Sequence, residues 1–225
     1  MEPLINIVTR THRRPKYFDN CVKSITQQSY QNIRHVVTYQ TEEDYEYIKG
    51  YTHNIVPVKV PNVEKDLAKF TTIYDDVRAD HAPYNAHFNQ AYDVINEGWI
   101  LHVDDDDMLL YSNAIEYIVQ NIKSYTIENI LHLWFVDFKA YKVPHPPVME
   151  AYKQGHEFIR GNVSTIGLCF HSNYKKIANW HEWALGDWDI YQKLDKVIPN
   201  RNCMDITLTG IQTYPGKGKA EDAVT

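Results

Sequence analysis

Residues 98–111 read GWILHVDDDDMLLY and place four carboxylates directly after an apolar run. The run from Trp99 to Val103 predicts a buried strand, and Asp104 to Asp107 follow at its carboxyl end. Two carboxylates about 6 Å apart repel by roughly 3 kcal/mol at an effective dielectric near 20. On a solvated acidic turn this repulsion would be screened, but beside a core strand it calls for a compensating charge. The pattern therefore favours a cation site over an acidic turn.

The ligand type narrows the choice of cation. Carboxylate oxygens suit Mg2+ and Mn2+, which usually take one or two carboxylates together with water and substrate phosphates. If strand geometry persists, Asp104 and Asp106 point to one side and Asp105 and Asp107 to the other. One pair can then reach the metal. A calcium loop of EF-hand type does not fit, because Met108 stands at its third ligand position.

The sequence before this strand alternates strands and helices. Strands are predicted at 4–9, 33–38 and 55–60, with the last at an edge because it contains Pro57. Helices are predicted from Pro15, after a Thr41–Asp44 capping box, and over an apolar stripe at 84–95. This order predicts an α/β fold with a mostly parallel central sheet flanked by helices. Ligands of such sheets bind at the carboxyl ends of strands, where the aspartates and Thr9-Arg10-Thr11 lie.

The second half has a mixed α+β pattern. Strands are predicted at 130–138 and 163–170, helices over 112–122 and 183–194, and a loop at VPHPPV, 143–148. The polar residues 215–225 predict a mobile tail. Because no linker separates the halves, we expect one domain over 1–225.

Composition limits the choice of partner and compartment. The chain has 225 residues and a formal net charge of -6, which argues against nucleic acid as a partner. No apolar run is long enough to cross a bilayer, and the N-terminus lacks a signal-peptide pattern. The cysteines, Cys21, Cys169 and Cys203, are three in number and far apart, which is typical of reduced thiols. We expect a cytoplasmic protein, with a peripheral position at a membrane as an alternative.

Several motifs in order resemble family 2 glycosyltransferases, which have the GT-A fold. INIVTRTHRRPKYFDNCVKSITQQSYQNI, residues 5–33, is similar to the opening of these enzymes. The similarity continues with Asn89, with the Asp-x-Asp-Asp signature at 104–107, and with ALGDWDIYQKL at 184–194. YPGKGK, 214–219, resembles a loop that closes over the donor. The resemblance implies a nucleotide-sugar-binding half over 1–111 and an acceptor-side half over 112–214.

The resemblance also implies a role for particular residues. Asp106 would be the metal ligand, and Asp104 would support it and hold the donor ribose. Asp187 would be the general base. The other residues expected to bind the donor are Thr9, Arg10, Tyr39, Asn89 and Asp105.

The implied reaction is metal-dependent transfer of a hexose or deoxyhexose from a nucleoside diphosphate to a hydroxyl of a glycan or glycoconjugate, with inversion. UDP is the first expectation for the nucleotide, with GDP and dTDP as alternatives. Three other functions stay open: a retaining transferase of the same fold, an inactive nucleotide-sugar-binding or scaffold protein, and a nucleotidyltransferase that releases pyrophosphate.

The chain departs from the family pattern at several positions. Tyr39-Gln40 replaces the acidic pair that often reads the base, so Tyr39 could stack on the base or simply pack. The other departures are Phe88 and Gln212 in place of Arg, Gly186 in place of Glu, and Tyr214 in place of His. Trp180, Trp183 and Trp188 could stack on an acceptor sugar or anchor the core.

Overall fold

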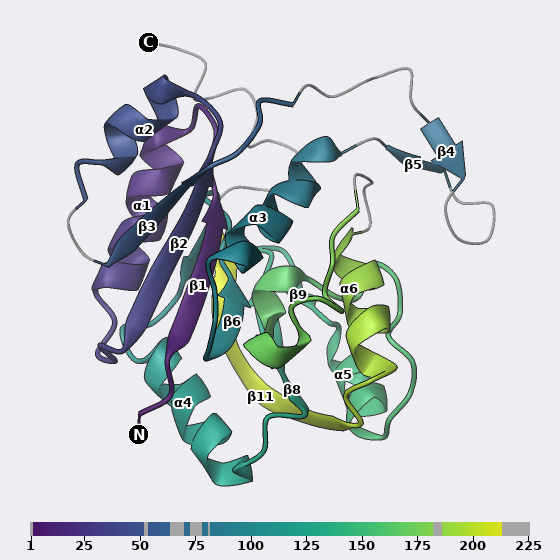
Figure 1. Cartoon of the computed structure of the whole chain (residues 1–225). Helices are drawn as coiled ribbons and strands as arrows, with labels where there is room; N and C mark the ends of the chain where they lie inside the picture. Colours follow the sequence, from purple (N-terminus) through teal and green to yellow (C-terminus); the bar gives the residue numbers. More distant parts are fainter. Residues whose placement is uncertain are drawn as a thin grey trace.

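The computed structural model describes residues 2–51, 54–63, 70–72, 78–80, 82–181 and 186–212. Within these residues a nine-stranded sheet runs through the molecule (Figure 1). Its strands are β1 (Ile5–Arg10), β2 (Ile33–Tyr39), β3 (Ile55–Lys59), β6 (Trp99–His102), β7 (Asp107–Leu109), β8 (Ile130–Asp137), β9 (Lys142–Val143), β10 (Leu168–His171) and β11 (Asn200–Ile211). A separate two-stranded sheet consists of β4 (Phe70–Thr72) and β5 (Arg78–Asp80).

The helices are α1 (Pro15–Thr26), α2 (Glu42–Ile48), α3 (His87–Asp93), α4 (Ala114–Tyr125), α5 (Pro146–Lys153) and α6 (Gly186–Asp195). Short 3-10 turns lie at η1 (Pro83–Ala86), η2 (Thr165–Gly167) and η3 (Ser172–Tyr174). No helix in the described ranges is long and apolar enough to span a membrane.

The sheet order is β3-β2-β1-β6-β10-β8-β11-β7, and β9 pairs with β8. Strands β3, β2, β1 and β6 are parallel, so their carboxyl ends share one edge. Strand β10 runs antiparallel to both β6 and β8, which makes β8 parallel to β6. The predicted α/β class, with a mostly parallel central sheet flanked by helices, is confirmed.

Helices cover the two faces of the sheet with separate apolar clusters (Figure 1). Alternation along β1 sends Ile7 to the face covered by α1 and α4, and Val8 to the face covered by α3 and α6. Local signals in the sequence set the ends of these helices. Pro15 stands at the start of α1, and Thr41 caps α2 by accepting a hydrogen bond from the Asp44 backbone amide.

Two expectations for the second half were wrong. The 143–148 segment is not a loop throughout, because Pro146 and Pro147 begin α5, and Met149 and Tyr152 bury its inner face. The strand expected at 163–170 is shorter, since η2 precedes β10. Gly167 lies in η2, where an added Cβ would come within 2.8 Å of Val136 Cγ2. The helix expected from 183 begins at Gly186, and residues 182–185 lie outside the described part, as does the 215–225 tail.

The sequence pattern did not predict β7 or β11. Strand β11 contains the buried polar residues Asn202 and Thr209, which break the apolar alternation that marks a strand. Both polar side chains are satisfied inside the protein: Asn202 Nδ2 contacts His132 Nδ1 at 3.1 Å, and Thr209 Oγ1 accepts from Trp134 Nε1 at 3.0 Å. Strand β11 pairs with β7 and thereby holds the segment that follows the aspartates.

Candidate functional site

A tight turn follows β6 and gathers three of the four aspartates. Thr9 Oγ1 donates to the Val103 carbonyl at 2.6 Å and fixes the point where the strand ends. The Asp107 backbone amide then donates to the Asp104 carbonyl at 2.9 Å, which closes the turn. One carboxylate oxygen each from Asp104, Asp106 and Asp107 lies within 4.8 Å of the other two. This group of oxygens could hold a hard divalent cation.

The turn changes which aspartates face one another. Continued strand geometry would have put Asp107 opposite Asp104 and Asp106. Because the chain turns at Asp105 and Asp106, Asp107 joins the other two, and Asp105 alone is fully buried. Asp105, which was expected to bind the donor, is therefore buried and lies outside the group of oxygens.

Arg14 is the main partner of the buried carboxylate, and the sequence interpretation missed it. Its Nε donates to Asp105 Oδ2 at 3.1 Å, its Nη2 contacts Asp105 Oδ1, and its Nη1 donates to Asp106 Oδ2 at 2.7 Å. Thr11 Oγ1 also donates to Asp105 at 2.9 Å. Burial alone would lower the pKa of Arg14, but the carboxylates of Asp105 and Asp106 outweigh it and raise that pKa. The available signal was a second basic residue in the loop after the first strand.

Arg10, which was expected to bind the donor, lies beside the four aspartates and donates two hydrogen bonds to Asp104. Its Nη2 donates to Asp104 Oδ2 at 2.6 Å, and its Nε donates to Oδ1 at 3.1 Å. Nη1 donates to Asn85 Oδ1 at 2.6 Å. The guanidinium carbon lies 4.6 Å from the ring centroid of Phe88. Phe88 thus supports Arg10 through a cation–π contact.

The cluster holds more negative charge than its arginines balance. Burial raises the pKa of Asp107, and the charges of Asp106 and Asp104 raise it further. Among the described residues no cation forms an ion pair with Asp107. A bound divalent cation would offset both the cost of burying these carboxylates and their mutual repulsion, so these residues fit Mn2+ or Mg2+.

Asp187 lies in the first turn of α6, close enough to the cluster to interact with it electrostatically. Its Oδ2 accepts from the Thr165 backbone amide at 3.4 Å. Burial raises the pKa of Asp187, the positive charge of Arg10 lowers it, and Asp104 raises it. The side chain does not belong to the three-carboxylate group.

Gly186 occupies a position where no side chain fits. An added Cβ would lie 2.7 Å from Cζ3 of Trp180 and 3.2 Å from Nδ2 of Asn85. Trp180 therefore fills the space that a side chain at this position would need.

We expect Gly186→Ala to lower the free energy of unfolding by about 1–3 kcal/mol, because the new methyl group overpacks against the indole. Urea denaturation would measure the loss. Gly50→Ala is the matched control, since an added Cβ there meets only the Tyr47 carbonyl oxygen at 3.6 Å. Equal stability of the two variants would contradict the packing explanation.

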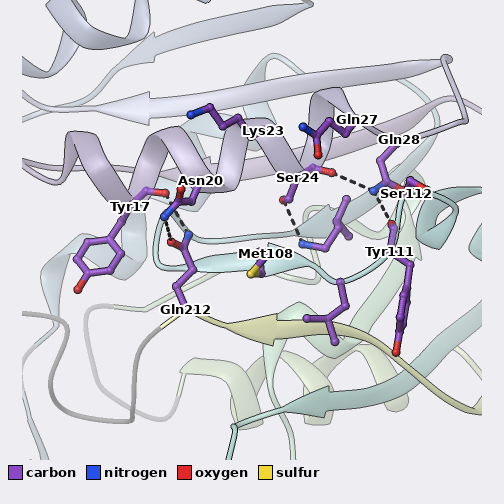
Figure 2. A pocket seen from close by; sticks show the side chains of 12 residues that line it. Tyr17, Asn20, Lys23, Ser24, Gln27, Gln28, Met108, Tyr111, Ser112 and Gln212 are labelled. Atoms are coloured by element: carbon purple, nitrogen blue, oxygen red, sulfur yellow. Dashed lines mark hydrogen bonds between the residues drawn. The ribbon is translucent and has the colours of Figure 1, made fainter.

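Gln212 connects the backbone of the aspartate turn to α1, and Figure 2 shows its hydrogen bonds to Tyr17 and Asn20 of that helix. Its Nε2 lies 2.9 Å from the Asp105 carbonyl, 3.0 Å from the Asp107 carbonyl and 3.0 Å from the Tyr17 carbonyl. Its backbone amide donates to the Asp106 carbonyl at 2.8 Å. Gln212 also borders a pocket of about 560 Å³ between α1 and residues 108–112, which none of the aspartates lines. The glutamine thus supports the backbone of the turn.

Three other expected donor residues lie outside the carboxylate group. Thr9 is fully buried and, as described, bonds to Val103. Tyr39 stacks on Tyr45 with ring centroids 5.3 Å apart. Asn89 uses both ends of its amide on the Trp180 backbone, at 2.9 and 3.0 Å.

The described tryptophans serve the core. Trp180 is buried, and its Nε1 donates to the Tyr92 hydroxyl at 3.0 Å. Trp188 is half-buried, and its Nε1 donates to the Phe158 carbonyl at 2.9 Å. Trp183 lies outside the described residues.

The sequence matches no protein-family model and no curated protein. Solved structures do match by fold. Residues 1–349 of S. aureus TarS in complex with UDP-GlcNAc align with a TM-score of 0.70 and 13% identity, covering 95% of this chain and 60% of that one. The mannosyltransferase PcManGT from Pyrobaculum calidifontis, in complex with GDP-Man and Mn2+, aligns with a TM-score of 0.63 and 8% identity, covering 97% and 59%.

A longer S. aureus TarS structure has a TM-score of 0.65 and 10% identity, with 93% of this chain and 37% of that chain covered. The chain thus spans about 60% or less of the length of these neighbours. At such low identity the likeness concerns the fold. The chain has the α/β fold of these glycosyltransferases.

Proposed function

We propose that this protein is a metal-dependent glycosyltransferase of GT-A type. It would move a hexose or deoxyhexose from a nucleoside diphosphate to a hydroxyl of a glycan or glycoconjugate, with inversion. The observation that carries the proposal is the group of oxygens from Asp104, Asp106 and Asp107 at the carboxyl end of β6. The fold neighbours support it, because TarS structures are complexes with UDP-GlcNAc and with UDP, and the PcManGT structure is a complex with GDP-Man and Mn2+.

The three carboxylates would hold Mn2+ or Mg2+, with Asp104 and Asp106 as the principal ligands. When bound, the cation would offset negative charge on the diphosphate leaving group. Arg10 forms an ion pair with Asp104, and Arg14 forms ion pairs with Asp105 and Asp106. A guanidinium group can bind phosphate oxygens, so these two arginines beside the carboxylates would also contact the donor diphosphate.

Asp187 would take the proton from the acceptor hydroxyl. A general base works best when its pKa lies near the working pH, and burial raises the pKa of Asp187 in that direction. The Thr165 backbone amide orients the carboxylate. Asn89 and Thr9 would support donor binding indirectly, because they hydrogen-bond to the backbones of Trp180 and Val103.

The test is a panel of UDP-, GDP- and dTDP-sugars with glycan acceptors, in Mn2+ and in chelator. We expect release of a nucleoside diphosphate only with metal. At a hundred times the dissociation constant, a donor would stabilise the folded protein by about 2.7 kcal/mol. Asp106→Asn should lose both the release of nucleoside diphosphate and the stabilisation by donor. Asp93→Asn should keep both, because Asp93 is an exposed residue at the end of α3.

Other outcomes of the panel would identify the alternatives. Release of pyrophosphate would indicate a nucleotidyltransferase. Donor binding without release of any nucleoside diphosphate would indicate an inactive nucleotide-sugar-binding or scaffold protein. Metal-dependent binding that survives in Asp106→Asn would show that the cation site lies elsewhere.

A further inference from the structure

Asn85 connects Arg10 to the start of α6. The residue belongs to η1, which leads directly into α3, and it is buried, with an exposed fraction of 7%. Its Oδ1 accepts a hydrogen bond from Arg10 Nη1 at 2.6 Å. A Cβ added at Gly186 would lie 3.2 Å from Asn85 Nδ2, so the amide also lies against the first turn of α6. One neutral side chain therefore contacts both the arginine of β1 and the helix that carries Asp187.

Two aromatic residues of the same helical segment also contact Arg10. Its guanidinium carbon lies 5.1 Å from the ring centroid of Tyr84 and 4.6 Å from that of Phe88. Residues three and four positions apart on a helical segment lie on one side of it, so Asn85 and both rings can meet one arginine. Phe88 is fully buried and packs on Trp180, with ring centroids 4.6 Å apart. The arginine is therefore held by a segment that is itself fixed in the core.

The guanidinium of Arg10 is engaged at all three of its nitrogens. Nε and Nη2 donate to the two oxygens of Asp104, at 3.1 and 2.6 Å, while Nη1 donates to Asn85. A paired contact of this kind fixes the plane of the carboxylate. Because each carboxylate oxygen can accept twice, both oxygens of Asp104 keep a position for a cation. Arg10 thus orients Asp104 without blocking it.

A neutral acceptor suits the position of Asn85. The guanidinium of Arg10 would be repelled by a divalent cation at Asp104, and a free arginine side chain could move away. The Asn85 oxygen anchors Nη1 and adds no charge beside four carboxylates. The hydrogen bond therefore keeps Arg10 in place both before and after a cation binds.

We propose that Asn85 is a positioning residue for the cation site: it fixes Arg10, and Arg10 in turn orients Asp104. This inference rests on the proposed function, because it assigns the support of the proposed metal ligand. The charges of Arg10 and Asp187 also interact, so the same support reaches the candidate base.

The test measures Mn2+ affinity and the state of Arg10 without any turnover. Electron paramagnetic resonance of unbound Mn2+ gives the dissociation constant. Heteronuclear NMR of the arginine side chains in isotope-labelled protein reports whether the guanidinium is fixed, and Arg10→Lys identifies its signals. Asn85→Leu keeps a similar volume but cannot accept a hydrogen bond, whereas Asn85→Asp keeps an oxygen for Nη1. Asn85→Ala replaces the leucine variant if that variant does not fold.

Asn202→Leu is the matched control. Asn202 is 8% exposed, and its Nδ2 lies 3.0 Å from Asn121 Oδ1 and 3.1 Å from His132 Nδ1. It lies near the start of β11, whereas the strand meets β7 at its other end. The variant therefore removes a buried amide that makes hydrogen bonds but does not contact Arg10. Urea denaturation would establish that each variant is folded under the conditions of the binding measurement.

We expect Asn85→Leu to weaken Mn2+ binding by about tenfold, the lower end of the effect of residues behind a metal ligand. The Nη signals of Arg10 should broaden in the same variant. Asn85→Asp should bind Mn2+ at least as tightly as the wild type, and Asn202→Leu should match the wild type even if it is less stable.

Wild-type Mn2+ affinity in folded Asn85→Leu, an equal loss in Asn202→Leu, or an unchanged Arg10 spectrum would overturn the proposal. A wild type that binds no Mn2+, but whose Arg10 signals broaden in Asn85→Leu, would contradict the proposed metal-dependent function and leave the support of Arg10 by Asn85 standing.

Discussion

Replacing Asp187 with asparagine should lower the turnover number by about 10²–10⁴-fold, the usual contribution of a general base. The asparagine side chain keeps an oxygen that can accept from the Thr165 amide, so the local structure should persist. It cannot take the acceptor proton. Donor binding should stay close to that of the wild type, because Asp187 lies outside the three-carboxylate group.

The pH dependence gives an independent check of the same assignment. The base must be deprotonated to act, so turnover should rise with pH as Asp187 loses its proton. Because burial raises the pKa of Asp187, turnover should increase at a pH higher than the ordinary pKa range of an aspartate. The initial-rate profile in saturating donor would measure it.

Asp195→Asn, at the other end of α6, is the matched control and should leave the turnover number unchanged. Wild-type turnover in Asp187→Asn would remove the base assignment. In that case the anomeric configuration of the product, read by NMR, would decide between the inverting transferase and the retaining alternative.

Two neighbouring aspartates should respond oppositely to the same change. Burial raises the pKa of Asp105 to about 8, and above that pH its carboxylate is the buried ion-pair partner of Arg14. In that range Asp105→Asn should lower the free energy of unfolding by about 3 kcal/mol, because Arg14 then loses this partner. Asp107→Asn should raise it by about 1–3 kcal/mol in metal-free buffer, since it removes one member of a repelling group. Urea denaturation in chelator at about pH 9, above the pKa of Asp105, would measure both.

The gain in Asp107→Asn should depend on pH in a defined direction. The pKa of Asp107 is raised in the folded protein, so the folded state binds the proton more tightly than the unfolded state. Wild-type stability should therefore fall as pH rises above the unfolded pKa of about 3.9. The advantage of the variant should vanish below that pH, where both states are protonated. An advantage that does not change with pH would show that charge is not its cause.

Much of this site could be predicted from the sequence because the signals were local. Four aspartates after an apolar run placed the candidate cation site, and Thr9-Arg10 marked the end of the first strand. The contribution of Arg14, Asn85 and Gln212 could not be predicted. Each acts through contacts with residues far away in the chain. The second basic residue in the loop after the first strand was a local signal for Arg14, but no short-range pattern marks Asn85 or Gln212.

The sequence alone determined the alternation of strands and helices, because apolar periodicity and capping residues act over a few positions. It also determined that acidic side chains gather at a strand end. Only the tertiary structure decided which of them face one another. The turn is closed by the Asp104 carbonyl, and Gln212 hydrogen-bonds to its backbone. This turn directs Asp107 toward Asp104 and Asp106 and leaves Asp105 buried with Arg14. The direction of a side chain after a strand ends depends on that turn, and the turn depends on partners that the fold supplies.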